Sequence, residues 1–128
     1  MIDHVSLAVS DLAASAAFYD RVLEPLGLAR LVERAGTVGF GKRYPEFWLN
    51  ARPGIGPAPA DTGSHICLRA PTKEAVKTFH QRAIDLGGQC DGAPGDRQGA
   101  MTPYFGAFIR DPDGNKLEAV TFPRSGTE

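Results

Sequence analysis

The sequence predicts an α+β fold built from two tandem βαβββ modules. The first observation behind this prediction is an internal repeat: a shift of 61 residues aligns His4-Val5-Ser6-Leu7 with His65-Ile66-Cys67-Leu68. The same shift pairs Phe18 with Phe79 on the faces of two predicted helices. The second observation is that both aligned segments alternate in polarity, as strands with one buried face do. Two copies of one supersecondary unit explain both observations.

Each copy begins with a predicted strand that has one apolar face. In the first copy Val5, Leu7 and Val9 share this face, because successive side chains of a strand point to opposite sides. The residues predicted on the opposite faces of the two strands are His4, Ser6 and Ala8 in the first copy and His65, Cys67 and Arg69 in the second. The apolar faces are expected to pack on helices, which leaves the polar faces to meet around a shared cleft.

A helix is predicted after each of these strands. Ser10 or Asp11 is suited to cap the first helix, and Pro25-Leu26-Gly27 ends it. Thr72 is suited to cap the second helix, and Gly87-Gly88 ends it.

Short strands complete each half. They are predicted at 28–34, 37–41 and 47–50 in the first half, and at 89–90 with its continuation, 104–110 and 116–122 in the second. Residues 111–115 have the composition of a hairpin turn, and 91–103, rich in Gly and Pro, is predicted to be a loop. The predicted organisation is a single domain at 1–122, with module one at 1–51, a linker at 52–64 and module two at 65–122, followed by a C-terminal tail at 123–128.

Length and composition exclude several classes of protein. The 128 residues have the size of one domain that can bury its own core. A net charge of −1 gives no reason to expect nucleic acid or a membrane as a partner. No apolar run is long enough for a membrane span, and no signal peptide is recognised. Two cysteines fit a reducing compartment, so a cytoplasmic location is expected.

Two histidines and one glutamate are candidate metal ligands. His4 and His65 occupy the same position of the repeat, and Glu118 lies in the last predicted strand, opposite to its apolar face. Two imidazoles and one carboxylate form the set that binds a divalent metal on one side and leaves other positions open. The alternative is that the histidines lie at strand ends and Glu118 is a solvated surface residue.

Four segments together resemble a known superfamily. They are the two strand starts at 4–7 and 65–68, Phe18-Tyr19-Asp20, and the ending Asp111-Pro112-Asp113-Gly114-Asn115-Lys116-Leu117-Glu118. The ending is the most specific, because Asp-Pro-x-Gly is followed by Glu four residues after the Gly. With these segments, nearly all of residues 2–122 resembles the vicinal oxygen chelate superfamily, which includes glyoxalase I, extradiol dioxygenases, fosfomycin-resistance enzymes and bleomycin-binding proteins.

The resemblance implies a fold, a metal site and a partner. The fold is a pair of βαβββ modules forming a cupped, partly open mixed β-barrel, usually in a homodimer. His4, His65 and Glu118 match three of the superfamily's metal-ligand positions, which implies one divalent ion, either Zn²⁺, Ni²⁺, Mn²⁺ or Fe²⁺. Bleomycin-binding members keep the fold and use no metal in this way.

The chain departs from the superfamily's best-known enzymes. Trp48 stands where glyoxalase I has a fourth ligand, unless a shift of register brings Glu46 or Asn50 there. Phe108 stands where extradiol dioxygenases have a Tyr, although Tyr104 on the same strand face can substitute. The anion-binding Lys, Ser and Tyr of fosfomycin transferases are not evident. No reaction type follows, and no catalytic residue is assigned.

The predicted cup is lined by side chains that suit a small molecule. Besides the three ligands, the predicted substrate-binding residues are Ser6, Trp48, Cys67, Tyr104 and Phe108. The aromatic members suit a flat or apolar molecule with two neighbouring oxygens. The sequence therefore predicts a metal-dependent lyase, isomerase or oxygenase, or alternatively a metal-free binding or sequestration protein of the bleomycin-resistance type.

Overall fold

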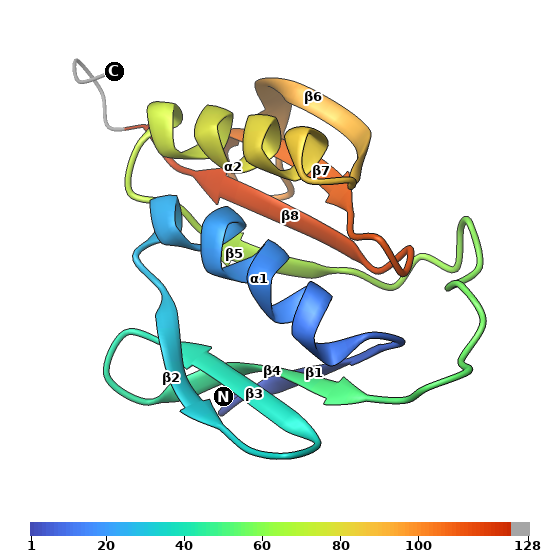
Figure 1. Ribbon diagram of the computed structural model, residues 1–128. Helices are drawn as coiled ribbons and strands as arrows, with labels where there is room; N and C mark the ends of the chain where they lie inside the picture. Colours follow the sequence, from blue (N-terminus) through green and yellow to red (C-terminus); the bar gives the residue numbers. More distant parts are fainter. Residues whose placement is uncertain (124–128) are drawn as a thin grey trace.

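The computed structural model describes residues 1–123 and contains two helices, a short 3₁₀ helix and eight strands (Figure 1). The first module consists of β1 (Val5–Val9), α1 (Leu12–Val22), η1 (Glu24–Leu26), β2 (Ala29–Glu33), β3 (Thr37–Gly41) and β4 (Pro45–Ala51). The second consists of β5 (Ile66–Arg69), α2 (Lys73–Asp85), β6 (Gln89–Gln98), β7 (Pro103–Arg110) and β8 (Lys116–Thr121). The predicted tail at 123–128 lies, apart from Pro123, outside the described residues.

The two modules have the same topology. The strand orders are β1-β4-β3-β2 and β5-β8-β7-β6, so neither sheet closes on itself. In each sheet the first and last strands of the module pair in parallel, and the other pairs are antiparallel. The register is also repeated, because Ser6 lies opposite Trp48 in one sheet and Cys67 lies opposite Glu118 in the other. The predicted α+β fold of two βαβββ modules with mixed sheets is confirmed.

The helices begin and end where the sequence provides caps. The Asp11 carboxylate accepts a hydrogen bond from the Ala14 backbone N–H, and Thr72 caps α2 in the same way. Of the two predicted caps for α1, Asp11 and not Ser10 is therefore the one used. α1 itself ends at Val22, before the predicted stop at Pro25-Leu26-Gly27, and Gly27 instead ends η1. Gly27 after η1 and Gly87 after α2 have φ values of +84° and +99°, which an L side chain rarely adopts.

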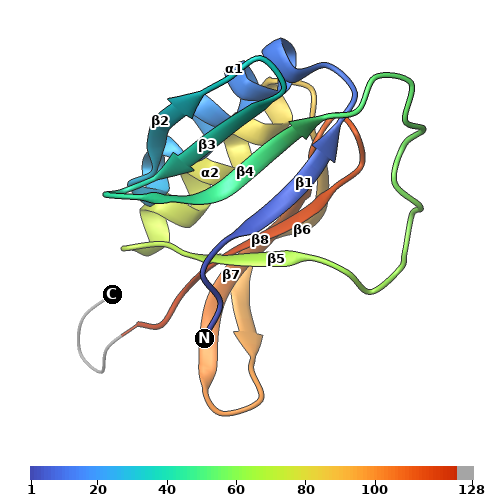
Figure 2. The same ribbon diagram turned by 90° about the horizontal axis from the view of Figure 1, so that it is seen from below.

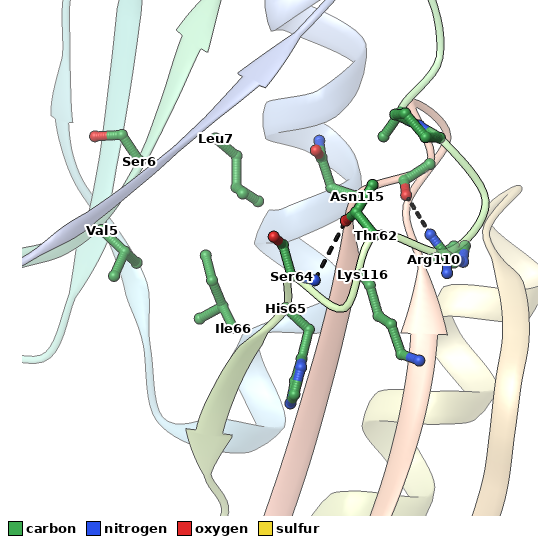
Figure 3. A pocket seen from close by; sticks show the side chains of 13 residues that line it. Val5, Ser6, Leu7, Thr62, Ser64, His65, Ile66, Arg110, Asn115 and Lys116 are labelled. Atoms are coloured by element: carbon green, nitrogen blue, oxygen red, sulfur yellow. Dashed lines mark hydrogen bonds between the residues drawn. The ribbon is translucent and has the colours of Figure 1, made fainter.

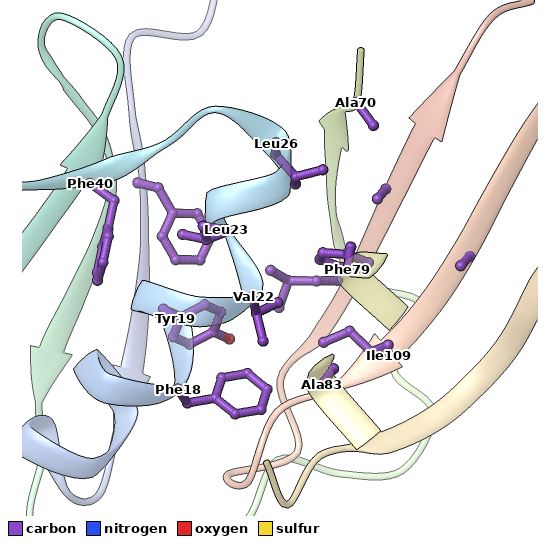
Figure 4. Close-up of a cluster of buried hydrophobic side chains, with 14 of the residues drawn as sticks. Phe18, Tyr19, Val22, Leu23, Leu26, Phe40, Ala70, Phe79, Ala83 and Ile109 are labelled. Carbon is purple, nitrogen blue, oxygen red and sulfur yellow. The ribbon is translucent and has the colours of Figure 1, made fainter. Parts of the chain in front are cut away.

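A single hydrophobic core joins the two modules (Figure 4). The inner faces of both sheets and the buried faces of both helices contribute to it. Tyr19 of α1 is fully buried, and its ring lies 5.0 Å from that of Phe18 and 5.1 Å from that of Phe47. Its hydroxyl donates to Asp111 Oδ2 at 2.7 Å, in the turn between β7 and β8. This bond ties module one to module two inside the core.

The β7–β8 turn also binds the end of β1. Asn115 donates from its side chain to the Ala8 carbonyl at 3.0 Å, and Asp113 accepts from the Ser10 backbone N–H at 3.1 Å. Burial raises the pKa of Asp111, although hydrogen bonds from Tyr19 and Asn115 act in the opposite direction. The turn is therefore both a hairpin, as predicted, and a contact between modules.

The prediction that 91–103 forms a loop is wrong for its first part. β6 continues to Gln98, with two shifts of register against β7, between Cys90 and Gly92 and between Gly92 and Gly95. Arg97 stabilises the irregular stretch because its guanidinium donates to the carbonyls of Ala93, Gly95 and Gly106. The Gly and Pro residues of this segment favour a loop prediction, but here they lie in a strand that β-bulges interrupt without ending. Figure 2 shows the resulting β6–β7 hairpin extending beyond the rest of its sheet.

The opposite faces of the two sheets are not covered by the helices. We call them the open faces, and they carry the polar residues of the alternating strands. In β5, for example, Ile66 and Leu68 pack against the core, whereas Cys67 and Arg69 are exposed. Among residues 1–123, neither α1 nor α2 is long and apolar enough to cross a membrane.

Candidate functional site

The open face of module two contains a buried carboxylate. Glu118, on the central strand β8, is 5% exposed. Its Oε1 lies 3.1 Å from His65 Nε2, and its Oε2 accepts a hydrogen bond from the Tyr104 hydroxyl at 2.9 Å. A carboxylate deprived of water is costly unless polar groups compensate it, so these two contacts make the position tolerable. We call His65, Tyr104 and Glu118 the carboxylate cluster.

Two glycines make room for the Tyr104 ring. A Cβ on Gly106 would lie 3.0 Å from Tyr104 Cε2, and one on Gly99 would lie 3.1 Å from Tyr104 Cδ1 and 2.4 Å from the Thr102 carbonyl oxygen. Neither position accepts a larger residue without displacing its neighbours. The hydroxyl reaches Glu118 because the backbone leaves this space free. Burial, together with the bond to Glu118, raises the pKa of Tyr104, so the hydroxyl stays protonated and donates.

Cys67 lies beside the carboxylate cluster and is exposed on the same open face. Partial desolvation of the thiol, followed by the influence of the neighbouring Glu118, raises the pKa of Cys67 to about 12. The sulfur is therefore a protonated thiol at neutral pH and not a thiolate.

Phe108 borders the cluster on its other side. The His65 ring meets it edge-on, with centroids 5.6 Å apart. Lys116 Nζ lies 4.8 Å and the Arg97 guanidinium carbon 5.5 Å from the Phe108 centroid. Two cations near one aromatic face are favourable. Lys116 in turn lies 3.0 Å from Asp91, and this ion pair lowers the pKa of that carboxyl.

His4 does not lie with His65 and Glu118 in the described chain. Its side chain is 54% exposed, and Nδ1 lies 2.6 Å from Asp3 Oδ1. Asp3 also accepts a hydrogen bond from Tyr44, and the bonds from Tyr44 and His4 lower the pKa of Asp3. Within residues 1–123, no three residues of the types His, Cys, Asp and Glu gather closely enough to bind one metal ion.

Trp48 is the counterpart of Glu118 in module one. It lies opposite Ser6 as Glu118 lies opposite Cys67, so the register places neither Glu46 nor Asn50 at this position. The indole lies over Gly39, where a Cβ would come within 2.8 Å of the ring. Asn50 is engaged elsewhere, because it accepts a hydrogen bond from Thr37. The fourth-ligand position of the repeat therefore holds an aromatic ring.

A cleft of about 410 Å³ runs between the unpaired edges of β1 and β5 (Figure 3). Val5, Ser6 and Leu7 line one side, and His65 and Ile66 line the other. A second cavity, of about 320 Å³, lies beside Glu118 and is lined by Cys67, Tyr104 and the tip of the β6–β7 hairpin. Ser6 and His65 thus share the cleft between modules, whereas Cys67, Tyr104 and Glu118 share the second cavity.

The carboxylate cluster fits part of a metal site. Ligand atoms of Zn²⁺ lie about 2.0–2.2 Å from the ion, so two neighbouring ligand atoms are about 3.4 Å apart at the tetrahedral angle and about 3.0 Å apart at a right angle. His65 Nε2 and Glu118 Oε1 are separated by 3.1 Å. These residues are therefore suited to bind one ion as neighbouring ligands, and they leave the remaining positions to other groups.

Three residues near the site have roles that the sequence did not predict, namely Asp3, Gly99 and Arg69. Alternation of polarity placed Arg69 on the open face of β5 but gave it no role, because its contact with Phe122 joins segments distant in sequence. Gly99 carried no signal, because its role depends on the exact fit of the Tyr104 ring. Asp3 had a usable signal, since it directly precedes a candidate histidine ligand, and carboxylates commonly orient such histidines.

Comparisons with known proteins agree on one superfamily. A sequence model described as the Glyoxalase/Bleomycin resistance protein/Dioxygenase superfamily matches residues 1–119. A crystal structure of a glyoxalase/bleomycin resistance protein from Albidiferax ferrireducens is 34% identical, with a TM-score of 0.81, and the alignment covers 94% of this chain and 98% of that one.

More distant relatives share the architecture. A glyoxalase/bleomycin resistance protein/dioxygenase family enzyme from Burkholderia phytofirmans is 19% identical, with a TM-score of 0.67 and coverage of 94% of this chain and 97% of that chain. A virulence protein of Salmonella typhimurium is 28% identical over 123 residues, which cover 91% of this chain and 81% of that protein.

Proposed function

Because the chain belongs to the Glyoxalase/Bleomycin resistance protein/Dioxygenase superfamily, we propose that it is a metal-dependent enzyme acting on a small molecule with two neighbouring oxygen atoms. His65 and Glu118 are the proposed ligands within one chain, and the ion is Zn²⁺, Ni²⁺, Mn²⁺ or Fe²⁺. The observation that carries the proposal is the burial of Glu118 beside His65 on a sheet face that no helix covers.

A purely structural role explains Glu118 poorly. Replacing a buried polar pair by apolar residues of similar size is often neutral or stabilising, so a contribution to stability is a weak reason for a carboxylate at this position. Tyr104 binds Oε2 and thereby orients Oε1 toward His65. An orienting hydrogen bond of this kind is what metal-binding carboxylates commonly receive.

The third proposed ligand is His4 of a second copy of the chain. His4 is exposed at the start of β1, and Asp3 binds its Nδ1, which leaves Nε2 available to a ligand outside the chain. A carboxylate on one imidazole nitrogen while the other binds metal is a recurrent arrangement. A homodimer in which module one of one chain meets module two of the other would bring His4 to the carboxylate cluster, and closed dimers are the commonest oligomers.

The residues around the cluster would bind the substrate and orient the metal ligand Glu118. When bound, a divalent ion supplies Lewis-acid polarisation of the two substrate oxygens. Tyr104 keeps Glu118 in place, and the protonated Cys67 thiol presents a weak donor beside it. Phe108 and Trp48 offer aromatic surface to the substrate, and Trp48 does not compete for the ion because an indole is not a metal ligand.

Metal content tests the proposal directly. Protein purified without an affinity tag is analysed for metals before and after dialysis against a chelator, beside His65→Ala, His4→Ala and the control His80→Ala. We expect close to one equivalent per chain, lost in the first two variants and retained in the control, because His80 lies on α2. A full complement in His65→Ala would rule out this ligand set.

Mixed dimers test the origin of the third ligand. If His4 acts across the interface, a dimer of one His4→Ala chain and one His65→Ala chain retains one intact site. Co-refolding the two inactive variants would then restore part of the metal binding. If both ligands came from the same chain, the mixture would stay without metal.

A metal-free binding protein is the second candidate. The observation that favours it is Trp48, which occupies the position equivalent to Glu118 with an aromatic ring. Absence of metal in the purified protein, together with no uptake of the four ions, would support this candidate. A thermal-shift screen of small aromatic and apolar compounds would then identify the ligand.

A further inference from the structure

We propose that the substrate is a small monoanion whose apolar part occupies the cavity beside Glu118 and whose anionic group binds Arg69. The inference rests on the proposed function, because it names the substrate class of the same site. The cavity has a volume of about 320 Å³, at the lower end of the range for small-molecule sites. The proposed binding residues are Arg69, Met101, Val120 and Phe122.

The wall of the cavity away from Glu118 is apolar. Val120 and Phe122 form it on the side of β8, and Met101 forms it at the tip of the β6–β7 hairpin. Met101 is 95% exposed, and Phe122 is 40% exposed. Large apolar side chains gathered at an open cavity gain most when an apolar ligand covers them. Met is also flexible enough to adapt to the shape of that ligand.

Arg69 lies against Phe122, one of the side chains that line this cavity. It follows Cys67 by two positions on β5, so both side chains share the open face. Its guanidinium carbon lies 4.6 Å from the centroid of the Phe122 ring, which fixes the charge beside the apolar wall. Its charge also acts to lower the pKa of the Cys67 thiol, which lines the cavity, against the larger effect of burial.

Among residues 1–123, Arg69 is the cation of the open face of module two that remains available for an anion. Arg97 donates hydrogen bonds to three backbone carbonyls. Arg110 and Lys116 each form an ion pair with Asp91, at 3.3 Å and 3.0 Å. By contrast, no carboxylate of residues 1–123 lies within ion-pair distance of Arg69. The nearby Glu118 is already bound by His65 and Tyr104.

The chemistry of these groups defines the ligand. An arginine fork binds the two oxygens of a carboxylate or phosphonate with paired hydrogen bonds. Arg69 lies opposite Val120, two positions beyond Glu118 on β8. An anionic group at Arg69 and oxygen atoms at Glu118 would therefore flank a compact apolar body over Val120 and Phe122. A cationic ligand would meet Arg69 as a like charge and is disfavoured.

Two matched probes test the preference for an anion. Hexanoate and its uncharged counterpart hexanamide are titrated by calorimetry into the chelator-treated protein, into Arg69→Gln and into Arg21→Gln. Arg21 is an exposed residue of α1, a helix that packs on the core side of its sheet, so Arg21→Gln is a charge-matched control. Hexylphosphonate, titrated in the same way, distinguishes a phosphonate from a carboxylate preference.

We expect hexanoate to bind the unsubstituted protein about tenfold more tightly than hexanamide, as one partly exposed charged hydrogen-bonding contact provides. Arg69→Gln should abolish this difference without weakening hexanamide, and Arg21→Gln should preserve it. Met101→Ser, at a nearly fully exposed position that does not affect folding, should weaken both probes equally. Equal affinities, an unchanged preference in Arg69→Gln, or no binding of either probe would overturn the inference.

Failure of this inference is distinguishable from failure of the proposed function. If the protein binds metal through His65 but shows no preference for hexanoate, only the substrate class is wrong. If Arg69 gives the preference in a protein that takes up no metal, the metal-dependent activity is wrong and the anion site belongs to a binding protein.

Discussion

The two modules have the same strand order and register, but their open faces differ in chemistry. In module two the position opposite Cys67 holds Glu118, buried and bound by two side chains. In module one the equivalent position, opposite Ser6, holds Trp48, whose ring lies over Gly39. A duplicated backbone therefore fixes where side chains point, whereas the neighbouring side chains decide what each position can do.

The largest expected effect concerns the carboxylates of the two modules. Glu118→Gln should weaken metal binding by more than about 100-fold, because it removes a proposed ligand while keeping the shape of the side chain. The matched control is Glu46→Gln on the open face of module one, which should change nothing. Equilibrium dialysis with Zn²⁺ measures the affinity of both variants. A strong loss of affinity in Glu46→Gln would mean that Glu46 is the fourth ligand, as a shifted register would require.

A second prediction tests how firmly Trp48 is seated. In Gly39→Ala the new methyl group would meet the indole at 2.8 Å, so the ring must move, and such overpacking costs about 1–3 kcal/mol. In Gly36→Ala the methyl group meets no atom within 4 Å. Since Trp48 is the single tryptophan of the sequence, its fluorescence reports the movement directly. An unchanged emission spectrum in Gly39→Ala would contradict the packing described above.

A third prediction compares two tyrosines that each donate to a carboxylate. Tyr104→Phe should lower the free energy of unfolding by about 1 kcal/mol, because it leaves a buried oxygen of Glu118 without its donor. Tyr44→Phe removes the same group from the exposed Asp3, where water replaces it, and should leave the unfolding midpoint unchanged. Urea denaturation of both variants, without metal, measures the difference. Equal changes in the free energy of unfolding of the two variants would mean that burial of Glu118 does not strengthen its hydrogen bond with Tyr104.

The smallest predicted effect concerns the contact between modules. Burial raises the pKa of Asp111 above its ordinary value of 3.8, so the folded state binds the proton more tightly than the unfolded state. The stabilisation from this proton is complete below pH 3.8 and is lost as the pH rises through the folded-state pKa.

The variant Asp111→Asn isolates this contribution, because asparagine does not titrate. As the pH falls from neutral to about pH 4, the free energy of unfolding of the unsubstituted protein should increase relative to that of Asp111→Asn. Thermal unfolding at a series of pH values measures the difference between the two proteins. A difference that stays constant with pH would show that Asp111 does not titrate abnormally in the folded state.

Local patterns predicted much of this fold. Alternation of polarity placed Cys67 on the open face of β5, directly after His65 and Ile66, and the repeat correctly paired the two modules. These features were readable because periodicity and capping act over a few residues. The strand β6 was missed because its register shifts at glycines, and a bulged strand lacks the regular alternation on which such a prediction depends.

Periodicity, the internal repeat and the closing motif were enough to predict the two βαβββ modules, the open-face positions of Cys67 and Glu118, and the superfamily. The folded chain was needed to show that Tyr104 and His65 bind Glu118, that His4 remains apart from them, and that Arg69 has no carboxylate partner among the described residues. The physical reason is that these facts depend on distances between strands remote in sequence. Such distances follow from how both modules pack around one core, and no local pattern records them.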